Sequence, residues 1–281
     1  MEERQQETAA HPLFPGRAFI STVLDALESK EAMSSAMTGV YLQRAAMAGF
    51  FVGLFFTTYF AVLAACSALG PAGAVAGRIL APLAFGWALV FIYYTNSELL
   101  TANMMVISIG CYHRRIVVSH AVRLLAYCLV GNLIGALAFA ALMRFSTVLD
   151  AGVLAQMQAA VARKTAYAAS AGGALDLFVR AMLCNFCINI AMLLVYNGKL
   201  KNDFTKCAVM VVAVFVFAFL GFEHSIANSA LFLIMGLRGG VEVLPALGSV
   251  AVAILGNLVG GGVLIGLNFA IMNRDSCRVR F

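Results

Sequence analysis

One histidine, His224, lies inside an apolar stretch of the chain, directly after the carboxylate of Glu223. An ionisable group in such surroundings is costly and usually marks an ion or proton pathway. Imidazole is also the side chain whose proton moves most readily near neutral pH. The alternative is a core histidine satisfied by a backbone carbonyl. We favour the proton-linked role, because the other histidines lie outside the apolar stretches or near their ends.

Glu223 also begins a short pattern that occurs twice. The pattern E-x-x-x-A-N spans residues 98–103 and 223–228, an offset of 223 − 98 = 125. The pattern G-N-L spans 131–133 and 256–258, at the same offset of 256 − 131 = 125. Two motifs in one register predict that the chain is an internal duplication.

The elements that carry these motifs are predicted to be membrane-spanning helices. The chain is 62% hydrophobic and 11% charged, whereas soluble domains carry roughly a quarter charged residues. Apolar stretches able to cross a hydrocarbon core of about 30 Å lie at 42–69, 79–95, 117–143, 174–196, 207–237 and 245–272. The second stretch stops at a polar run and resumes at 103–112, and the fifth is interrupted at Glu223. The sequence therefore predicts an all-α membrane protein of six spans, two of them broken.

Three spans in each copy predict an inverted repeat, because an odd number of crossings makes the second copy enter the membrane from the opposite side. Such repeats place their sites near the midplane, where broken helices meet. Non-helical backbone at that depth needs partners, since lipid offers no hydrogen bonds. We expect Glu98 and Glu223 to accept hydrogen bonds from the freed amides, and Asn103 and Asn228 to cap the half-helices that follow. The positive ends of those half-helices favour an anion at the centre.

Other residues in or near the spans are also candidates for chemistry. Thr101 lies three positions after Glu98 and offers a hydroxyl to a carboxylate oxygen or to its own backbone. Asn185 lies among apolar neighbours and needs a partner on a neighbouring helix or in a pore lumen. Cys184 and Cys187 have the spacing of a redox pair, but they lie within an apolar span and no βαβ pattern surrounds them.

The predicted organisation follows from these spans. An N-terminal cytoplasmic segment covers 1–39 and contains an amphipathic helix at 15–33 that lies on the membrane surface. The remaining parts are a membrane domain at 40–273, with repeats at about 40–145 and 174–273, and a cytoplasmic tail at 274–281. Placing both termini inside puts 13 of the 19 Lys and Arg residues on the cytoplasmic side, as the positive-inside rule favours.

Four segments resemble the formate/nitrite transporter family. They are Ser-Glu-Leu-Leu-Thr-Ala-Asn at 97–103, Leu-Cys-Asn at 183–185, Gly-Phe-Glu-His-Ser-Ile-Ala-Asn at 221–228 and Gly-Asn-Leu-Val-Gly-Gly-Gly at 256–262. The resemblance covers residues 15–273. It implies an aquaporin-like fold with an inverted repeat of three plus three helices, one pore per protomer, and a homopentamer in the cell membrane.

The resemblance also assigns roles near the centre of the pore. It makes Thr101 the family's loop threonine, His224 its central histidine, and Asn185 a polar residue near that histidine. The family carries a lysine ahead of Leu-Cys-Asn that attracts anions. Ala169 occupies its expected position in this chain, and Lys164 is the nearest candidate.

Two apolar constrictions are implied by the same resemblance. One, on the cytoplasmic side, is expected at Leu89 with Phe85 and Phe217 nearby. The other is expected at Leu100 and Ile188. Family members often carry Phe where this chain has Leu100, so the smaller side chain favours a larger acid such as lactate.

These residues together predict a channel or transporter for a small monovalent weak-acid anion. A bare carboxylate in an apolar constriction would cost roughly tens of kcal/mol in the Born limit and tends to neutralise instead. We therefore expect the anion to gain a proton beside His224 and Thr101 and to pass as the neutral acid. The sequence leaves open whether His224 gives that proton or positions one delivered by water. Formate leads the candidates, and nitrite, hydrosulfide, acetate and lactate are alternatives.

Two other functions are alternatives. A water or glycerol channel shares the expected fold, but the breaks lack the Asn-Pro-Ala pairs of such channels. A membrane thiol oxidoreductase would use Cys184 and Cys187. The expected partners are the anion, protons, the lipid bilayer and further copies of the chain. We expect no enzyme activity, no cofactor, no metal site and no nucleic-acid partner, because the net charge of +6 is explained by the cytoplasmic loops.

Overall fold

The computed structural model describes Phe14 and residues 16–273, so the predicted tail at 274–281 lies outside the described residues. Every secondary-structure element in the described part is a helix, as the sequence predicts. The elements are α2 (Arg17–Ala36), α3 (Thr38–Ser67), α4 (Pro71–Tyr94), α5 (Leu100–Tyr112), α6 (Val118–Arg144), α7 (Ala151–Ala166), η1 (Tyr167–Ala169), α8 (Ala171–Tyr196), α9 (Asp203–Phe219), α10 (Ser225–Gly236), α11 (Val243–Asn257), η2 (Leu258–Leu267) and α12 (Asn268–Met272).

Five helices of the described residues are long and apolar enough to cross a membrane: α3, α4, α6, α8 and the continuous helix formed by α11, η2 and α12. The two predicted breaks are present. One separates α4 from α5, and the other separates α9 from α10. The resumed helices begin at Leu100 and Ser225, a few residues before the predicted caps at Asn103 and Asn228.

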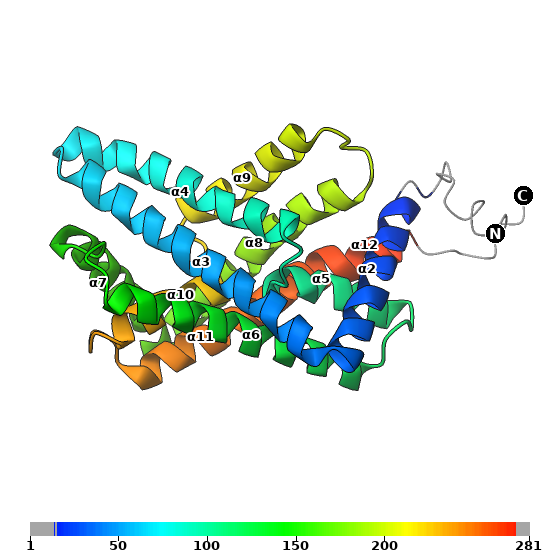
Figure 1. Cartoon of the computed structure of the whole chain (residues 1–281). Coiled ribbons are helices and arrows are strands. Elements are labelled where there is room, and N and C mark those ends of the chain that lie inside the picture. The colour runs from blue at the N-terminus through cyan, green and yellow to red at the C-terminus, as the bar shows by residue number, and fades with distance from the viewer. Residues whose placement is uncertain (1–13, 15, 274–281) are drawn as a thin grey trace, which may run out of the picture.

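The surface helices α2 and α7 lie at opposite ends of the molecule, with the long helices between them (Figure 1). The apolar side of α2 is buried within the protein, because Phe19, Val23 and Leu27 are each at most 1% exposed. The start of α2 is tied to the end of α12, where the backbone N–H of Gly16 donates to Asn273 Oδ1 at 2.9 Å. The chain's own helices thus cover the apolar stripe that the sequence assigned to the membrane surface.

Glycines allow two pairs of helices to approach until their backbones touch. A methyl group at Gly135 of α6 would lie 1.7 Å from the carbonyl oxygen of Ala46 in α3. A methyl at Gly260 of η2 would lie 1.9 Å from the carbonyl oxygen of Met182 in α8. The two glycines occupy equivalent repeat positions, since 260 − 135 = 125. Segment η2 is π-helical, and the close approach at Gly260 lies within it.

Replacing Gly135 or Gly260 by alanine is expected to destabilise the protein strongly. The methyl would meet rigid backbone rather than a movable side chain, and overpacking costs about 1–3 kcal/mol or more. Thermal unfolding in detergent should show a clear fall in melting temperature for both variants. Gly39→Ala is the matched control, because it lies in a helix with nothing within 4 Å of the added methyl. Equal melting of Gly135→Ala and Gly39→Ala would contradict the packing argument.

Candidate functional site

The first break is held by a buried carboxylate with two donors. Glu98 is 4% exposed and forms an ion pair with Lys30 of α2. Its Oε2 also accepts a hydrogen bond from Asn103 Nδ2 at 3.0 Å. The ammonium and the amide together satisfy a charge that would otherwise be costly at this depth.

The second break repeats this arrangement with different partners. Glu223 Oε2 lies 2.5 Å from Lys164 Nζ, a residue of α7. The same oxygen accepts from Asn228 Nδ2 at 2.8 Å. Lys164 therefore lies directly beside the break that contains His224. It is the candidate nearest in sequence to Ala169, which occupies the position of the family's lysine. Each half of the chain uses a lysine from its surface helix for this purpose.

The freed backbone amides at the breaks are satisfied by asparagines of the G-N-L motif. The N–H of Leu100 donates to Asn132 Oδ1 at 3.0 Å, and the N–H of Ser225 donates to Asn257 Oδ1 at 2.9 Å. The prediction that Glu98 and Glu223 accept from these amides is wrong, because lysine and asparagine side chains occupy the carboxylates.

The predicted capping by Asn103 and Asn228 is also wrong. Each lies within its helix and directs its Nδ2 to the carboxylate five residues earlier. The residues at the N-cap positions are Leu99 and His224, whose backbones are nearly identical, with φ −103° and ψ 128° at Leu99 and φ −103° and ψ 116° at His224. The two halves thus differ at this position only in the side chain.

His224 is held by both of its ring nitrogens. Nδ1 accepts a hydrogen bond from the backbone N–H of Ala227 at 3.0 Å, which caps α10. Nε2 lies 3.1 Å from Thr101 Oγ1. Because Nδ1 acts as an acceptor, the neutral ring carries its proton on Nε2 and donates it to Thr101. The ring of Phe217 lies nearly parallel to the imidazole, with centroids 6.1 Å apart.

Asn185 uses its amide on backbone between helices rather than in a lumen. Its Nδ2 donates to the carbonyl of Thr101 at 3.0 Å and to that of Asn257 at 2.7 Å. Asn189, one turn later, donates to the same Thr101 carbonyl at 3.2 Å. Both asparagines are fully buried. Asn189 was not among the predicted residues, although its spacing of four from Asn185 places both on one helix face.

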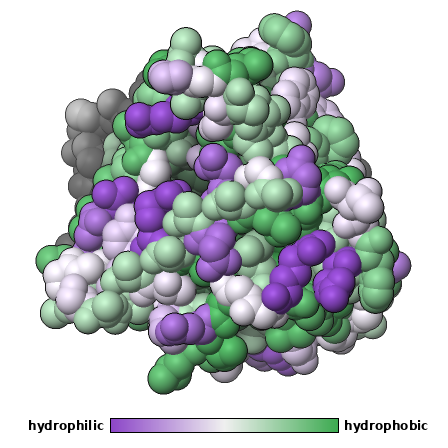
Figure 2. Space-filling model, turned by 90° about the vertical axis from the view of Figure 1, so that its left-hand side faces the viewer, coloured by the Kyte–Doolittle hydropathy of each residue, from purple (hydrophilic) through white to green (hydrophobic). Residues whose placement is uncertain are grey.

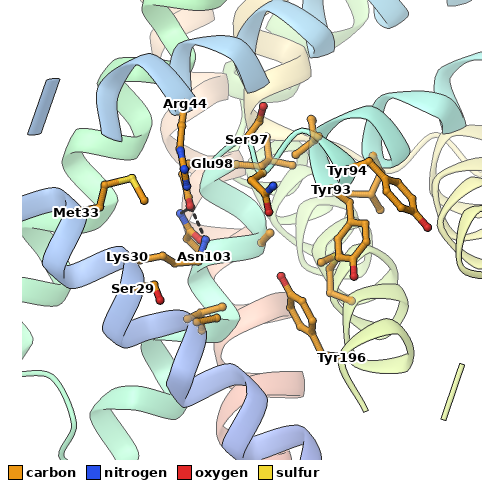
Figure 3. Close-up of a pocket in the computed structure, with 18 residues that line it drawn as sticks. Ser29, Lys30, Met33, Arg44, Tyr93, Tyr94, Ser97, Glu98, Asn103 and Tyr196 are labelled. Carbon is orange, nitrogen blue, oxygen red and sulfur yellow. Dashed lines mark hydrogen bonds and ion pairs between the residues drawn. The ribbon is translucent and has the colours of Figure 1, made fainter. Parts of the chain in front are cut away.

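Two vestibules and a small central cavity are connected by shared lining residues. The Lys30 vestibule has a volume of about 480 Å³ and contains Lys30, Glu98 and Asn103 on one side, with Tyr93 and Tyr196 on the other (Figure 3). The Lys164 vestibule has a volume of about 350 Å³. It belongs to the end that carries α7, where hydrophilic side chains gather around a hollow (Figure 2).

The third cavity, the central cavity, lies between the vestibules and has a volume of about 20 Å³, room for about one water molecule. Its lining residues are Val52, Phe85, Ala88, Leu89, Ile92, Leu99, Ile188, Val214, Phe217 and His224. His224 is the one ionisable side chain among them. The rest of the lining is apolar.

The constrictions are arranged differently from the prediction. Leu89 and Leu99 line both the central cavity and the Lys30 vestibule. Phe85 and Phe217 line both the central cavity and the Lys164 vestibule, on the side of His224. These phenylalanines do lie near Leu89 around the central cavity, as predicted, but they face the opposite vestibule.

Leu100 is also misplaced by the prediction. Its side chain is 2% exposed and lines none of the three cavities, whereas the preceding Leu99 does. The cause is the extended backbone of Leu99 at the N-cap position, which leaves Leu100 as the first residue of α5. Ile188 does line the central cavity, as expected. Thr101 is fully buried and contacts the cavity through His224.

The sequence profile of the formate/nitrite transporter family matches residues 18–271. This chain belongs to the formate/nitrite transporter family. Among similar proteins, the transporter YwcJ of Bacillus subtilis is 30% identical over 69% of this chain and 75% of its own length. The nitrite transporter NirC of Escherichia coli is 28% identical over 66% of this chain and 68% of its own length.

Solved structures of this family have the same fold. An ion channel of the formate/nitrite transporter family superposes with a TM-score of 0.76 at 22% identity, covering 89% of this chain and 97% of its own. A pentameric formate channel with formate bound superposes with a TM-score of 0.67 at 20% identity, covering 86% and 98%. The inverted-repeat, aquaporin-like fold is thereby confirmed. The protein is a membrane channel or transporter and not the thiol oxidoreductase considered as an alternative.

Proposed function

We propose that this formate/nitrite transporter family member passes a small monovalent weak-acid anion together with a proton, with formate as the leading substrate. The observation that carries this proposal is the central cavity, which is apolar apart from His224. An anion held there would lose its hydration without gaining a charge partner, whereas a neutral acid would not. Two polar vestibules on either side allow the anion and its proton to meet before the apolar section.

The hydrogen bonds of His224 indicate where the proton comes from. Its Nδ1 accepts from Ala227 and its Nε2–H is directed to Thr101. Release of the Nε2 proton would leave an imidazolate, and protonation of Nδ1 would break the helix cap. We infer that His224 and Thr101 position the acid while water in a vestibule delivers the proton. The positive ends of α5 and α10 favour the approach of the anion.

We also propose how the protein assembles and how it is oriented in the membrane. A homopentamer is supported by the likeness to a pentameric formate channel. The excess of Lys and Arg in the loops near α2 supports a cytoplasmic orientation of the Lys30 vestibule and of both termini in the cell membrane. The argument for lactate is weakened, because Leu100, on which it rested, does not line the cavities. Nitrite remains the second candidate, since the relative NirC is a nitrite transporter.

An uptake panel in proteoliposomes tests this function. Formate, nitrite, hydrosulfide, acetate and lactate are each supplied at two external pH values. We expect formate uptake to rise at the lower pH, because the higher proton concentration supplies the co-transported species, and lactate to enter least. Glycerol swelling without any anion flux would contradict the proposal and favour a neutral-solute channel. Heat-treated liposomes with the same protein content serve as the control.

A further inference from the structure

The charged residues of the two vestibules are not equally available to an anion. In the Lys30 vestibule, the ammonium of Lys30 is paired with the buried carboxylate of Glu98. In the Lys164 vestibule, the ammonium of Lys164 is paired with Glu223. The field of an ion pair in contact falls off faster with distance than the field of a single charge. The two lysines therefore hold the breaks together more than they attract an anion.

One arginine lines each vestibule without such a partner. Among the described residues, neither Arg44 in the Lys30 vestibule nor Arg163 in the Lys164 vestibule has a side-chain hydrogen bond or an ion pair within 4.0 Å. Arg180 also lines the second vestibule, but Asp176 accepts from its Nε at 2.9 Å through both oxygens.

The two arginines lie where an anion in either vestibule can reach them. The carbonyl oxygen of Arg44 accepts the backbone N–H of Glu98 at 3.2 Å, so this residue adjoins the first break, and its side chain reaches toward Glu98 and Asn103 (Figure 3). Arg163 lies in the last turn of α7 and is exposed at the mouth of its vestibule. A guanidinium binds an oxyanion through two parallel hydrogen bonds, which an ammonium cannot do.

We propose that Arg44 and Arg163 are the anion-capture residues of this protein, one in each vestibule. The ligand is a small monovalent oxyanion on its way to the central cavity. This inference rests on the proposed function, because it concerns how the transported anion is concentrated at the pore. In this proposal, two unpaired guanidinium groups attract the anion. The family resemblance had given that role to a lysine.

The size of the effect follows from Coulomb's law. A unit charge about 8 Å from an anion in water changes its local concentration about two- to threefold. Salt screens this attraction, with a Debye length of about 8 Å at physiological ionic strength. The flux of a dilute anion should therefore fall when an impermeant salt is added on either side of the membrane, and each arginine should account for one side.

The test measures formate flux from a dilute solution into proteoliposomes, with N-methylglucamine gluconate added to one side at a time. We expect Arg163→Gln to lower the flux about two- to threefold and to remove the salt dependence on one side only. Arg44→Gln should do the same on the other side. Because a passive pore has equal permeability in both directions, the side is identified by the salt and not by the direction of flux.

Matched variants separate charge from folding. Arg163→Lys and Arg44→Lys keep the charge and should restore most of the flux and its salt dependence. Arg144→Gln and Arg115→Gln remove exposed cations that line neither vestibule and should behave as the wild type. Unchanged salt dependence in both Arg→Gln variants, with normal wild-type formate flux, would overturn the inference alone. Absence of any formate flux in the wild type would overturn the proposed function with it.

Discussion

Replacement of His224 by alanine is expected to lower proton-linked formate uptake roughly ten- to a hundredfold. The hydroxyl of Thr101 would be left buried without its partner, and an unsatisfied buried polar group costs about 1–3 kcal/mol, or roughly a factor of ten for each 1.4 kcal/mol. The central cavity would also lose the one ionisable side chain in its lining. Uptake by proteoliposomes at two external pH values measures the effect.

His224→Asn is the matched control for this substitution. Asparagine is among the best N-cap residues, so it should retain the cap of α10, a contribution of about 1 kcal/mol that alanine loses. It lacks a ring nitrogen able to reach Thr101 as Nε2 does. We expect the asparagine variant to melt close to the wild type and yet to lose the pH dependence of uptake. Normal pH-dependent uptake by His224→Asn would show that the histidine serves only as a cap.

The second large effect is expected at Asn257, whose side chain makes three buried hydrogen bonds across the second break. Its Nδ2 donates to the carbonyls of Ala181 at 2.7 Å and Glu223 at 3.1 Å, and its Oδ1 accepts from Ser225. Asn257→Leu would leave these backbone groups without partners in a region that lipid cannot satisfy. At about 1–3 kcal/mol for each group, the protein should fail to accumulate as a stable oligomer.

The repeat supplies a comparison for this prediction. Asn132 makes the same three bonds at the first break, to the carbonyls of Ala45 and Glu98 and the N–H of Leu100, so Asn132→Leu should be equally damaging. Asn268 is an exposed asparagine of α12, and Asn268→Leu should leave the melting temperature nearly unchanged. Size-exclusion profiles and thermal melts in detergent measure all three. A stable, monodisperse Asn257→Leu protein would contradict the role assigned to the motif.

The sequence was sufficient for the repeat and for the identity of its buried residues. Two motifs in one register located both breaks, and the polar residues in them are the ones that the structure buries. Their bonding was not predictable, because the ion-pair partners come from surface helices outside the motif register. Lys164 and Lys30 are separated by 164 − 30 = 134 positions, so the repeat offset of 125 does not reveal that they are equivalent.

The order of the constrictions along the pore could not be predicted from the sequence either. Phe85 and Leu89 are one helical turn apart, about 6 Å along the axis. Both line the central cavity, which has a volume of only about 20 Å³. The resemblance placed both side chains near one constriction, whereas Leu89 faces the Lys30 vestibule and Phe85 faces the Lys164 vestibule. Leu99 was not predicted to line the pore. The direction of its side chain depends on backbone angles that the residue types around it do not specify.

The equivalence of Leu99 and His224 has a consequence for how this pore distinguishes the two faces of the membrane. The Lys–Glu and Asn–Glu contacts at the breaks occur in both halves, as a pseudo-two-fold axis between inverted repeats requires. This part of the framework therefore does not distinguish the two faces. An imidazole at one N-cap and an isobutyl group at the other are among the differences that break the equivalence. So are the hydroxyl of Thr101 where the second half has Ile226, and the amides of Asn185 and Asn189 where the first half has Phe60 and Ala64. Exchanging these few side chains between the two halves, with the backbone unchanged, would be enough to reverse the direction of the pore relative to the two faces of the membrane.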